Sequence, residues 1–97
     1  MKNYDKLIQQ FGTPKEGAPK PYDYVVEECA ELIQAIQHYK RGRADSLIHM
    51  INEMADVYTL MDATRFHLGI PFSEIEFFQQ KLIDRYLGLP NDGRHVD

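Results

Sequence analysis

The sequence has a single cysteine, no long apolar run and no excess of positive charge. Because Cys29 has no second cysteine to pair with, an intramolecular disulfide is excluded, as is usual in a reducing compartment. No apolar run approaches the roughly 20 residues that span a bilayer. The first residues also lack the apolar segment of a signal peptide. We therefore expect a soluble, cytoplasmic protein with no membrane partner.

The charge balance is mildly acidic, with 11 Lys and Arg against 15 Asp and Glu. Because no basic stripe is present to follow a phosphate backbone, we expect no nucleic-acid partner. A phosphorylated small molecule held through a metal ion is still compatible with this balance. The 97 residues suffice for one domain, 1–97, whose core is small, so self-association is expected.

No alternating apolar and polar run is long enough for a strand, and proline and glycine divide the chain into helical segments. We predict four helices, at about 2–11, 22–41, 46–68 and 73–87, with 88–97 as a flexible tail. The predicted fold is all-α. The two long helices form an antiparallel hairpin with flanking helices, of the four-helix-bundle type.

The helix ends carry recognisable signals. Gly12 is expected to follow the first helix as its C′ residue. Either Asp45 or Ser46 is expected to cap the third helix through its side chain. The run 73–76, Ser-Glu-Ile-Glu, matches a capping box and is expected to open the fourth helix.

Acidic side chains border the apolar faces of both long helices. On a helical wheel Glu28 lies at the edge of the apolar arc, with Glu31 one turn along. Glu53 and Asp56 repeat this spacing on the next helix. In an antiparallel hairpin the two pairs can face each other, and four ionised carboxylates so close together need a neutralising cation. Oxygen ligands without thiolate or imidazole select Mg²⁺, Mn²⁺ or Ca²⁺ over zinc.

The competing interpretation is a solvated acidic surface. Acidic pairs three residues apart are common on helices, and most are exposed or form weak ion pairs. Two such pairs, each at an apolar border on adjacent helices, favour a metal site. The pattern by itself predicts an acidic metal site in a helical bundle and no specific activity.

The run EECAEL at 27–32, followed by EMAD at 53–56, resembles the EExxE and ExxD signature of MazG-like, all-α NTP pyrophosphohydrolases. The resemblance covers about 22–62. It implies a bundle completed by dimerisation, as a dimer or a dimer of dimers. It implies Mg²⁺-dependent cleavage of a (d)NTP substrate to (d)NMP and pyrophosphate, with Mn²⁺ as an alternative ion.

The resemblance also implies roles for individual residues. The positions that hold Mg²⁺ in the family correspond here to Glu28, Glu31, Glu53 and Asp56. Glu28 or Glu31 is the expected catalytic base, and Glu27 matches the leading glutamate of the motif, whose role is not assigned. On the last helix, Lys81 and Arg85 resemble the basic residues that relatives use for substrate binding, although a solvated basic face is an equal alternative.

A nucleotide substrate also needs a surface that receives its base. Aromatic candidates are Tyr4, Phe11, Tyr22, Tyr24 and Tyr39. For each of them, packing in the core is the more frequent role. His49 precedes Glu53 by one helical turn and is a candidate neighbour of the metal ligands, although an ordinary surface or core histidine is the more frequent case.

Four other functions compete with this one. A phosphoribosyl-ATP pyrophosphohydrolase shares the helical carboxylate chemistry, as does a dimeric dUTPase, which needs extra helices. A di-iron bundle needs Glu-x-x-His pairs, and neither acidic pair supplies the histidine. A non-enzymatic helical interaction module would leave the acids solvated. The preferred base and sugar are not indicated by the sequence.

Overall fold

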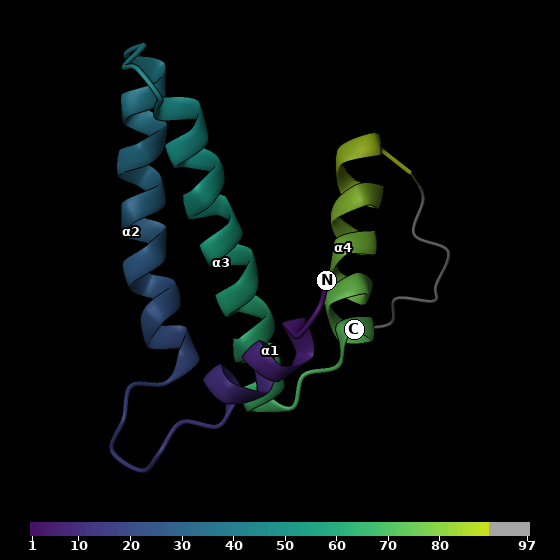
Figure 1. The fold of residues 1–97 in the computed structure, drawn as a ribbon. Helices are drawn as coiled ribbons and strands as arrows, with labels where there is room; N and C mark the ends of the chain where they lie inside the picture. The colour runs from purple at the N-terminus through teal and green to yellow at the C-terminus, as the bar shows by residue number, and fades with distance from the viewer. Residues whose placement is uncertain (90–97) are drawn as a thin grey trace.

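A computed structural model describes residues 1–89 and contains α1 (Tyr4–Gly12), α2 (Pro21–Lys40), α3 (Ser46–Leu68) and α4 (Phe72–Leu87). No strand occurs in this described part, so the predicted all-α class is confirmed. Figure 1 shows α2 and α3 as an antiparallel hairpin, with α1 across its base and α4 standing apart. No helix among the described residues is long and apolar enough to cross a membrane.

The hairpin is held by a small core. Extensive contacts between helices are confined, within residues 1–89, to α2 with α3 and α1 with α3. Within residues 1–89 the buried apolar side chains are Ile8, Ala35, Leu60 and Ala63, together with Pro21 at the start of α2. Two of these are alanines, which bring helix backbones close but remove little apolar area from water. This small core agrees with the expectation that a single chain buries little apolar surface.

Two predicted caps are wrong. Asp45 occupies the N-cap of α3, but its backbone is left-handed (φ 59°) rather than extended, and it forms no side-chain cap. Its carbonyl accepts the first helical bond, from His49 N at 3.2 Å. The capping box at 73–76 is not used either. Helix α4 already begins at Phe72 after an extended Pro71 (ψ 149°), whose carbonyl accepts from Glu74 N at 3.0 Å. Both helices therefore begin without a side-chain cap at the N-cap residue.

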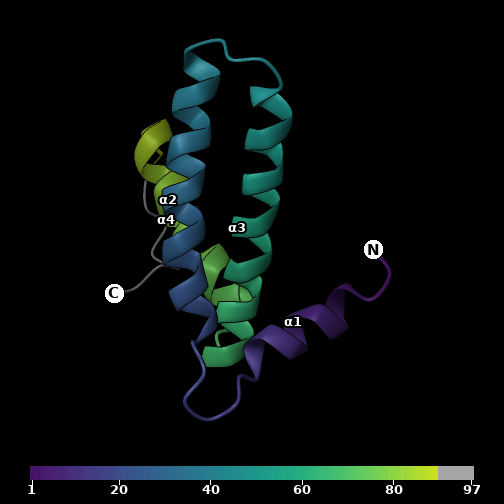
Figure 2. The ribbon, with the colours of Figure 1, turned by 60° about the vertical axis from the view of Figure 1, so that its left-hand side comes forward.

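Helix α1 is anchored to α3 by a close approach at its C-terminal end, which Figure 2 shows at the base of the hairpin. Gly12 is the last helical residue, not the predicted C′ residue. A Cβ placed on it would lie 2.4 Å from Phe66 Cδ1 and 3.3 Å from Ala63 O. His67 Nδ1 lies 3.1 Å from Gly12 O. Gly12 is therefore required by the packing of α1 on α3.

The other end of α1 is tied by a polar contact. Tyr4 donates its phenolic proton to Asp62 on α3. Asp62 also accepts from Arg65 Nη2 at 3.3 Å, and Arg65 Nη1 donates to Ile70 O at 3.2 Å. The Arg65 guanidinium lies 5.4 Å from the centroid of the Phe72 ring. This chain of contacts links α1 to the segment that leads into α4.

Helix α4 has no buried residue, although it carries large apolar side chains. Phe78 is 64% exposed and Tyr86 is 77% exposed. The helix ends at Gly88 in the left-handed conformation (φ 65°), as its sequence predicts. The predicted flexible tail, apart from Gly88 and Leu89, lies outside the described residues.

The contact at Gly12 gives a testable prediction for stability. Gly12→Ala should lower the free energy of unfolding by about 1 kcal/mol, because overpacking against Phe66 costs more than the helix propensity of alanine returns. Urea denaturation measures the change. In a Phe66→Ala background the same substitution should become neutral or stabilising. An equal loss in both backgrounds would show that the contact with Phe66 is not the cause.

Candidate metal centre

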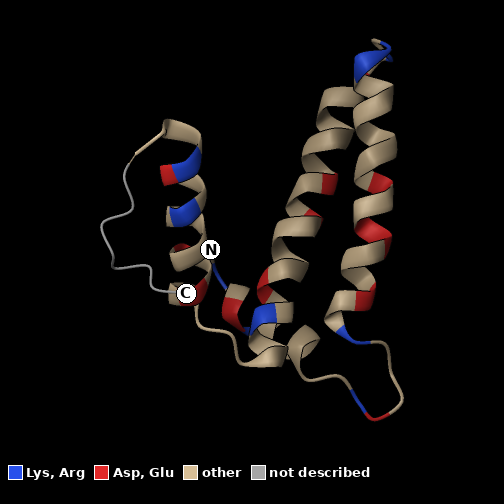
Figure 3. Ribbon diagram, turned by 180° about the vertical axis from the view of Figure 1, so that it is seen from behind, with Lys and Arg blue, Asp and Glu red and all other residues tan. Residues whose placement is uncertain are grey.

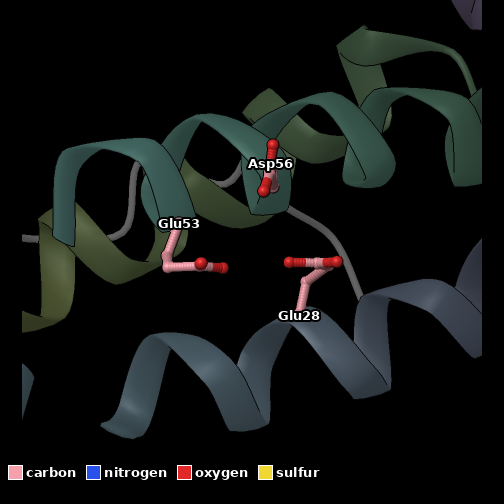
Figure 4. A group of neighbouring side chains, drawn as sticks. All are labelled: Glu28, Glu53 and Asp56. Carbon is pink, nitrogen blue, oxygen red and sulfur yellow. The ribbon is translucent and has the colours of Figure 1, made fainter. Parts of the chain in front are cut away.

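Three carboxylates from the two long helices meet across the hairpin. Figure 4 shows Glu28 of α2 pointing toward Glu53, with Asp56 beside them on α3. One oxygen from each of the three lies within 4.8 Å of the others. The i, i+3 spacing explains the pair on α3, and the antiparallel packing of α2 on α3 brings Glu28 opposite them. We call Glu28, Glu53 and Asp56 the acidic cluster.

The acidic cluster contains carboxylate oxygens that are buried but accept no hydrogen bond. Glu53 is only 9% exposed, Glu28 is half-buried and Asp56 is exposed. The Oε2 atoms of Glu28 and Glu53 are both shielded from solvent and have no hydrogen-bond partner. A buried acceptor without a partner is costly, and a buried charge more so. The site therefore calls for a bound proton or a cation.

The electrostatics of Glu28 reflect this crowding. The pKa of the Glu28 carboxyl is raised from 4.5 to about 7, with burial as the largest cause. The close approach of the Glu53 carboxyl and the charges of Glu31 and Asp56 contribute to the same rise. At neutral pH, without a cation, a proton therefore occupies part of the Glu28 population.

The fourth predicted ligand, Glu31, is not part of the acidic cluster. Its side chain is exposed, one turn along α2 from Glu28, and near enough to raise the pKa of Glu28. Glu27 is also exposed on α2.

The predicted substrate-binding residues, Lys81 and Arg85, lie on α4. Figure 3 shows two basic bands on this helix, whereas acidic bands lie on α2 and α3 of the hairpin. Lys81 Nζ is 5.1 Å from the centroid of Phe77, and the Arg85 guanidinium is 5.4 Å from that of Tyr86. Because α4 does not pack extensively on α2 or α3, a single chain does not bring Lys81 and Arg85 to the acidic cluster.

Two neighbours complete the surroundings of the acidic cluster. His49 Nε2 lies 4.0 Å from Glu53 Oε1, as the one-turn spacing predicts. A cavity also opens beside Glu28 and Asp56, and its wall includes Leu7 and Thr59, which sequence reasoning missed. Thr59 follows Asp56 by three residues, so helical spacing was an available signal. No local signal marks Leu7, because its place depends on how α1 docks.

Comparisons with known proteins add no relative. No family model matches the chain, and neither a curated protein nor a solved structure matches it.

The raised pKa of Glu28 predicts how stability depends on pH without divalent ions. Between about pH 4.5 and 7 the folded protein keeps a proton on Glu28 that the unfolded chain has lost. The free energy of unfolding should therefore fall as pH rises through this window and level off above it. Urea denaturation in EDTA measures this fall.

Glu28→Gln should flatten that part of the profile, since glutamine does not titrate. Glu27→Gln, at the exposed neighbouring position, is the matched control and should keep the slope. Parallel profiles for wild type and Glu28→Gln would rule out Glu28 as the source.

Proposed function

We propose that this protein is a divalent-cation-dependent nucleoside triphosphate pyrophosphohydrolase of the MazG-like type. The observation that carries the proposal is the pair of buried, unpartnered oxygens on Glu28 and Glu53, with Asp56 within ligand distance. A solvated acidic surface does not account for a glutamate that is 9% exposed and lacks a partner for its inner oxygen. The spacing of the EExxE and ExxD motifs supplies the choice of family.

The donor atoms fit a hard cation. Every group in the acidic cluster is a carboxylate, a set that suits Mg²⁺, with Mn²⁺ as the alternative. Glu28, Glu53 and Asp56 would hold the ion, with Glu31 at the edge as a further carboxylate. When bound, the ion neutralises charge on the phosphates and orients a water for attack.

The carboxylates of the chain divide between holding the ion and accepting a proton. Glu53 is the most buried of the acidic cluster, so it is suited to a fixed ligand role. The water that attacks the triphosphate loses a proton as the bond between the α- and β-phosphates breaks. Glu28 and Glu31 are the two acceptors on α2, and Glu31 is the more accessible to solvent.

We propose that the active form contains at least two copies of this chain. The hairpin has an apolar groove formed by Leu32, Met54, Val57, Tyr58 and Met61. Helix α4 carries exposed Phe78, Leu82 and Tyr86 and does not pack extensively on its own hairpin. Both surfaces are on every chain, so a second copy related by a two-fold axis can cover each of them reciprocally.

A second copy also offers a place for the basic residues of α4. Lys81 and Arg85 are one turn apart and project together. If α4 docks on the hairpin of the other copy, these cations approach the acidic cluster there and meet the phosphates of the substrate. This arrangement gives α4 a role that it does not have within one chain.

The activity is tested with a panel of NTPs and dNTPs, together with phosphoribosyl-ATP, incubated with Mg²⁺ and separated by chromatography. Monophosphate and pyrophosphate are the expected products. Glu53→Gln should lower kcat/KM by on the order of 100-fold or more, because it removes a charge that acts on the transition state. Glu76→Gln, an exposed glutamate on α4, is the control and should match wild type.

The same variant makes a prediction for the metal-free protein. In EDTA, Glu53→Gln should leave the free energy of unfolding unchanged or raise it, because repulsion between like charges is relieved.

In the activity assay, diphosphate and orthophosphate as products would contradict the proposed cleavage between the α- and β-phosphates. A chain with no turnover and no specific response to Mg²⁺ would instead be the non-enzymatic interaction module.

The assembly is tested by light scattering coupled to size-exclusion chromatography. Wild type should run as a dimer or a dimer of dimers. Tyr58→Lys places a charge in the apolar groove, at a side chain that is 66% exposed in one chain, and should shift the protein toward monomer. Asn52→Lys adds the same charge at another exposed position of α3 and should keep the wild-type mass. A monomeric wild type at all concentrations would contradict the assembly.

A further inference from the structure

A cavity of about 290 Å³ lies where α1, α2 and α3 meet, next to the acidic cluster. Two of its lining residues are Glu28 and Asp56, so cavity and acidic cluster share a border. The rest of its wall includes Leu7 and Phe11 of α1, Tyr24 of α2 and Thr59 of α3. An occupant of the cavity would therefore have one end at the carboxylates.

The wall of the cavity is apolar and aromatic with a few polar atoms. The rings of Phe11 and Tyr24 are 6.3 Å apart and meet edge to face, at 74°. Thr59 donates its hydroxyl proton to Ala55 O at 2.8 Å, which leaves the oxygen's lone pairs as acceptors. Flat apolar walls with a small number of polar groups are typical of sites for planar heterocyclic ligands.

Other aromatic candidates have contacts elsewhere. Tyr22 packs beside His67, with ring centroids 6.0 Å apart. Tyr4 is engaged with Asp62, and Tyr39 is exposed near the far end of α2. Of the five aromatic residues that the sequence offers for stacking, Phe11 and Tyr24 line the cavity beside the acidic cluster.

We infer that this cavity binds the nucleoside part of the substrate, between Phe11, Tyr24 and Thr59, and that the phosphates extend from it to Glu28 and Asp56. That this nucleoside belongs to a hydrolysed triphosphate rests on the proposed function. That the cavity binds a nucleoside is argued separately, from the residues that line it. Its volume is just below the roughly 300 Å³ lower bound common for ligand pockets. A simple nucleoside therefore fits better than a base that carries a second sugar phosphate.

Direct binding is measured with a fluorescent reporter. The sequence has no tryptophan, and Leu7 is 39% exposed at the cavity, so Leu7→Trp places a single indole there. Nucleoside monophosphates, titrated in EDTA, should quench its fluorescence in a saturable way. Ile33→Trp, at a 62% exposed position of α2 that does not line the cavity, should show only the linear loss from nucleotide absorbance.

The second test fills the cavity with a larger side chain and measures binding and KM. Thr59→Leu should weaken monophosphate binding and raise KM for the triphosphate by roughly 10-fold or more, the usual effect of a steric misfit. Its affinity for Mg²⁺ alone should be unchanged. Thr64→Leu is the matched control, because Thr64 is on the same helix, also donates to a carbonyl four residues earlier at 2.8 Å, and lies outside the cavity wall.

The outcomes separate this inference from the proposed function. Saturable quenching that Thr59→Leu removes supports the cavity as a nucleoside site even if no triphosphate is hydrolysed. Hydrolysis that Thr59→Leu leaves unchanged, with no saturable quenching of the tryptophan at position 7, overturns the inference and leaves the proposed function standing. If Thr59→Leu does not fold, the titration of Leu7→Trp decides the question alone.

Discussion

The arrangement of this protein depends on the crowding of carboxylates across the α2–α3 interface. Glu28 and Glu53 turn oxygens inward where neither water nor a hydrogen-bond donor reaches them. Such an arrangement is unfavourable for the isolated chain, because each buried charge loses its hydration and repels its neighbours. A divalent cation reverses the sign of this interaction. We therefore propose that the acidic cluster is a cation site that is preformed at a cost in stability.

The rest of the chain can be understood as support for that site. The small residues Ala35 and Ala63 bring helices close together, and Gly12 allows α1 to pack against α3 next to Phe66. Docking of α1 then closes one side of the cavity that borders the acidic cluster. Helix α4 contributes nothing to this core within one chain. We propose that its exposed apolar side chains pack against a second copy of the chain, where Lys81 and Arg85 also meet the phosphates of the substrate.

Local patterns in the sequence predicted much of this architecture. Helical spacing placed Glu53 and Asp56 together, and the short turn after Lys40 predicted the hairpin that brings Glu28 opposite them. Glu31, predicted by the same spacing, lies outside the acidic cluster, and its role as a ligand stays a prediction. The expected side-chain caps failed at Asp45 and Ser73 for different reasons. The backbone of Asp45 is left-handed rather than extended as in an ordinary N-cap, and Ser73 already lies inside α4, which begins at Phe72.

Features that depend on docking were beyond the reach of the sequence. Gly12 was expected to end a helix, and its contact with Phe66 appears only when α1 lies on α3. Leu7 likewise joins the cavity through the position of α1 and not through any motif. The separation of α4 from the hairpin follows from the path of residues 69–71, where Arg65 holds Ile70 O and packs over Phe72. None of these contacts has a periodic signature.

The claim that the acidic cluster is a cation site is tested most directly by calorimetric titration of Mg²⁺ near pH 7 in two buffers of different ionisation enthalpy. The account predicts saturable binding of at least one ion per chain, with release of part of a proton, because the cation displaces the proton held by Glu28. Binding that is absent, or that occurs with no proton release in either buffer, would contradict it.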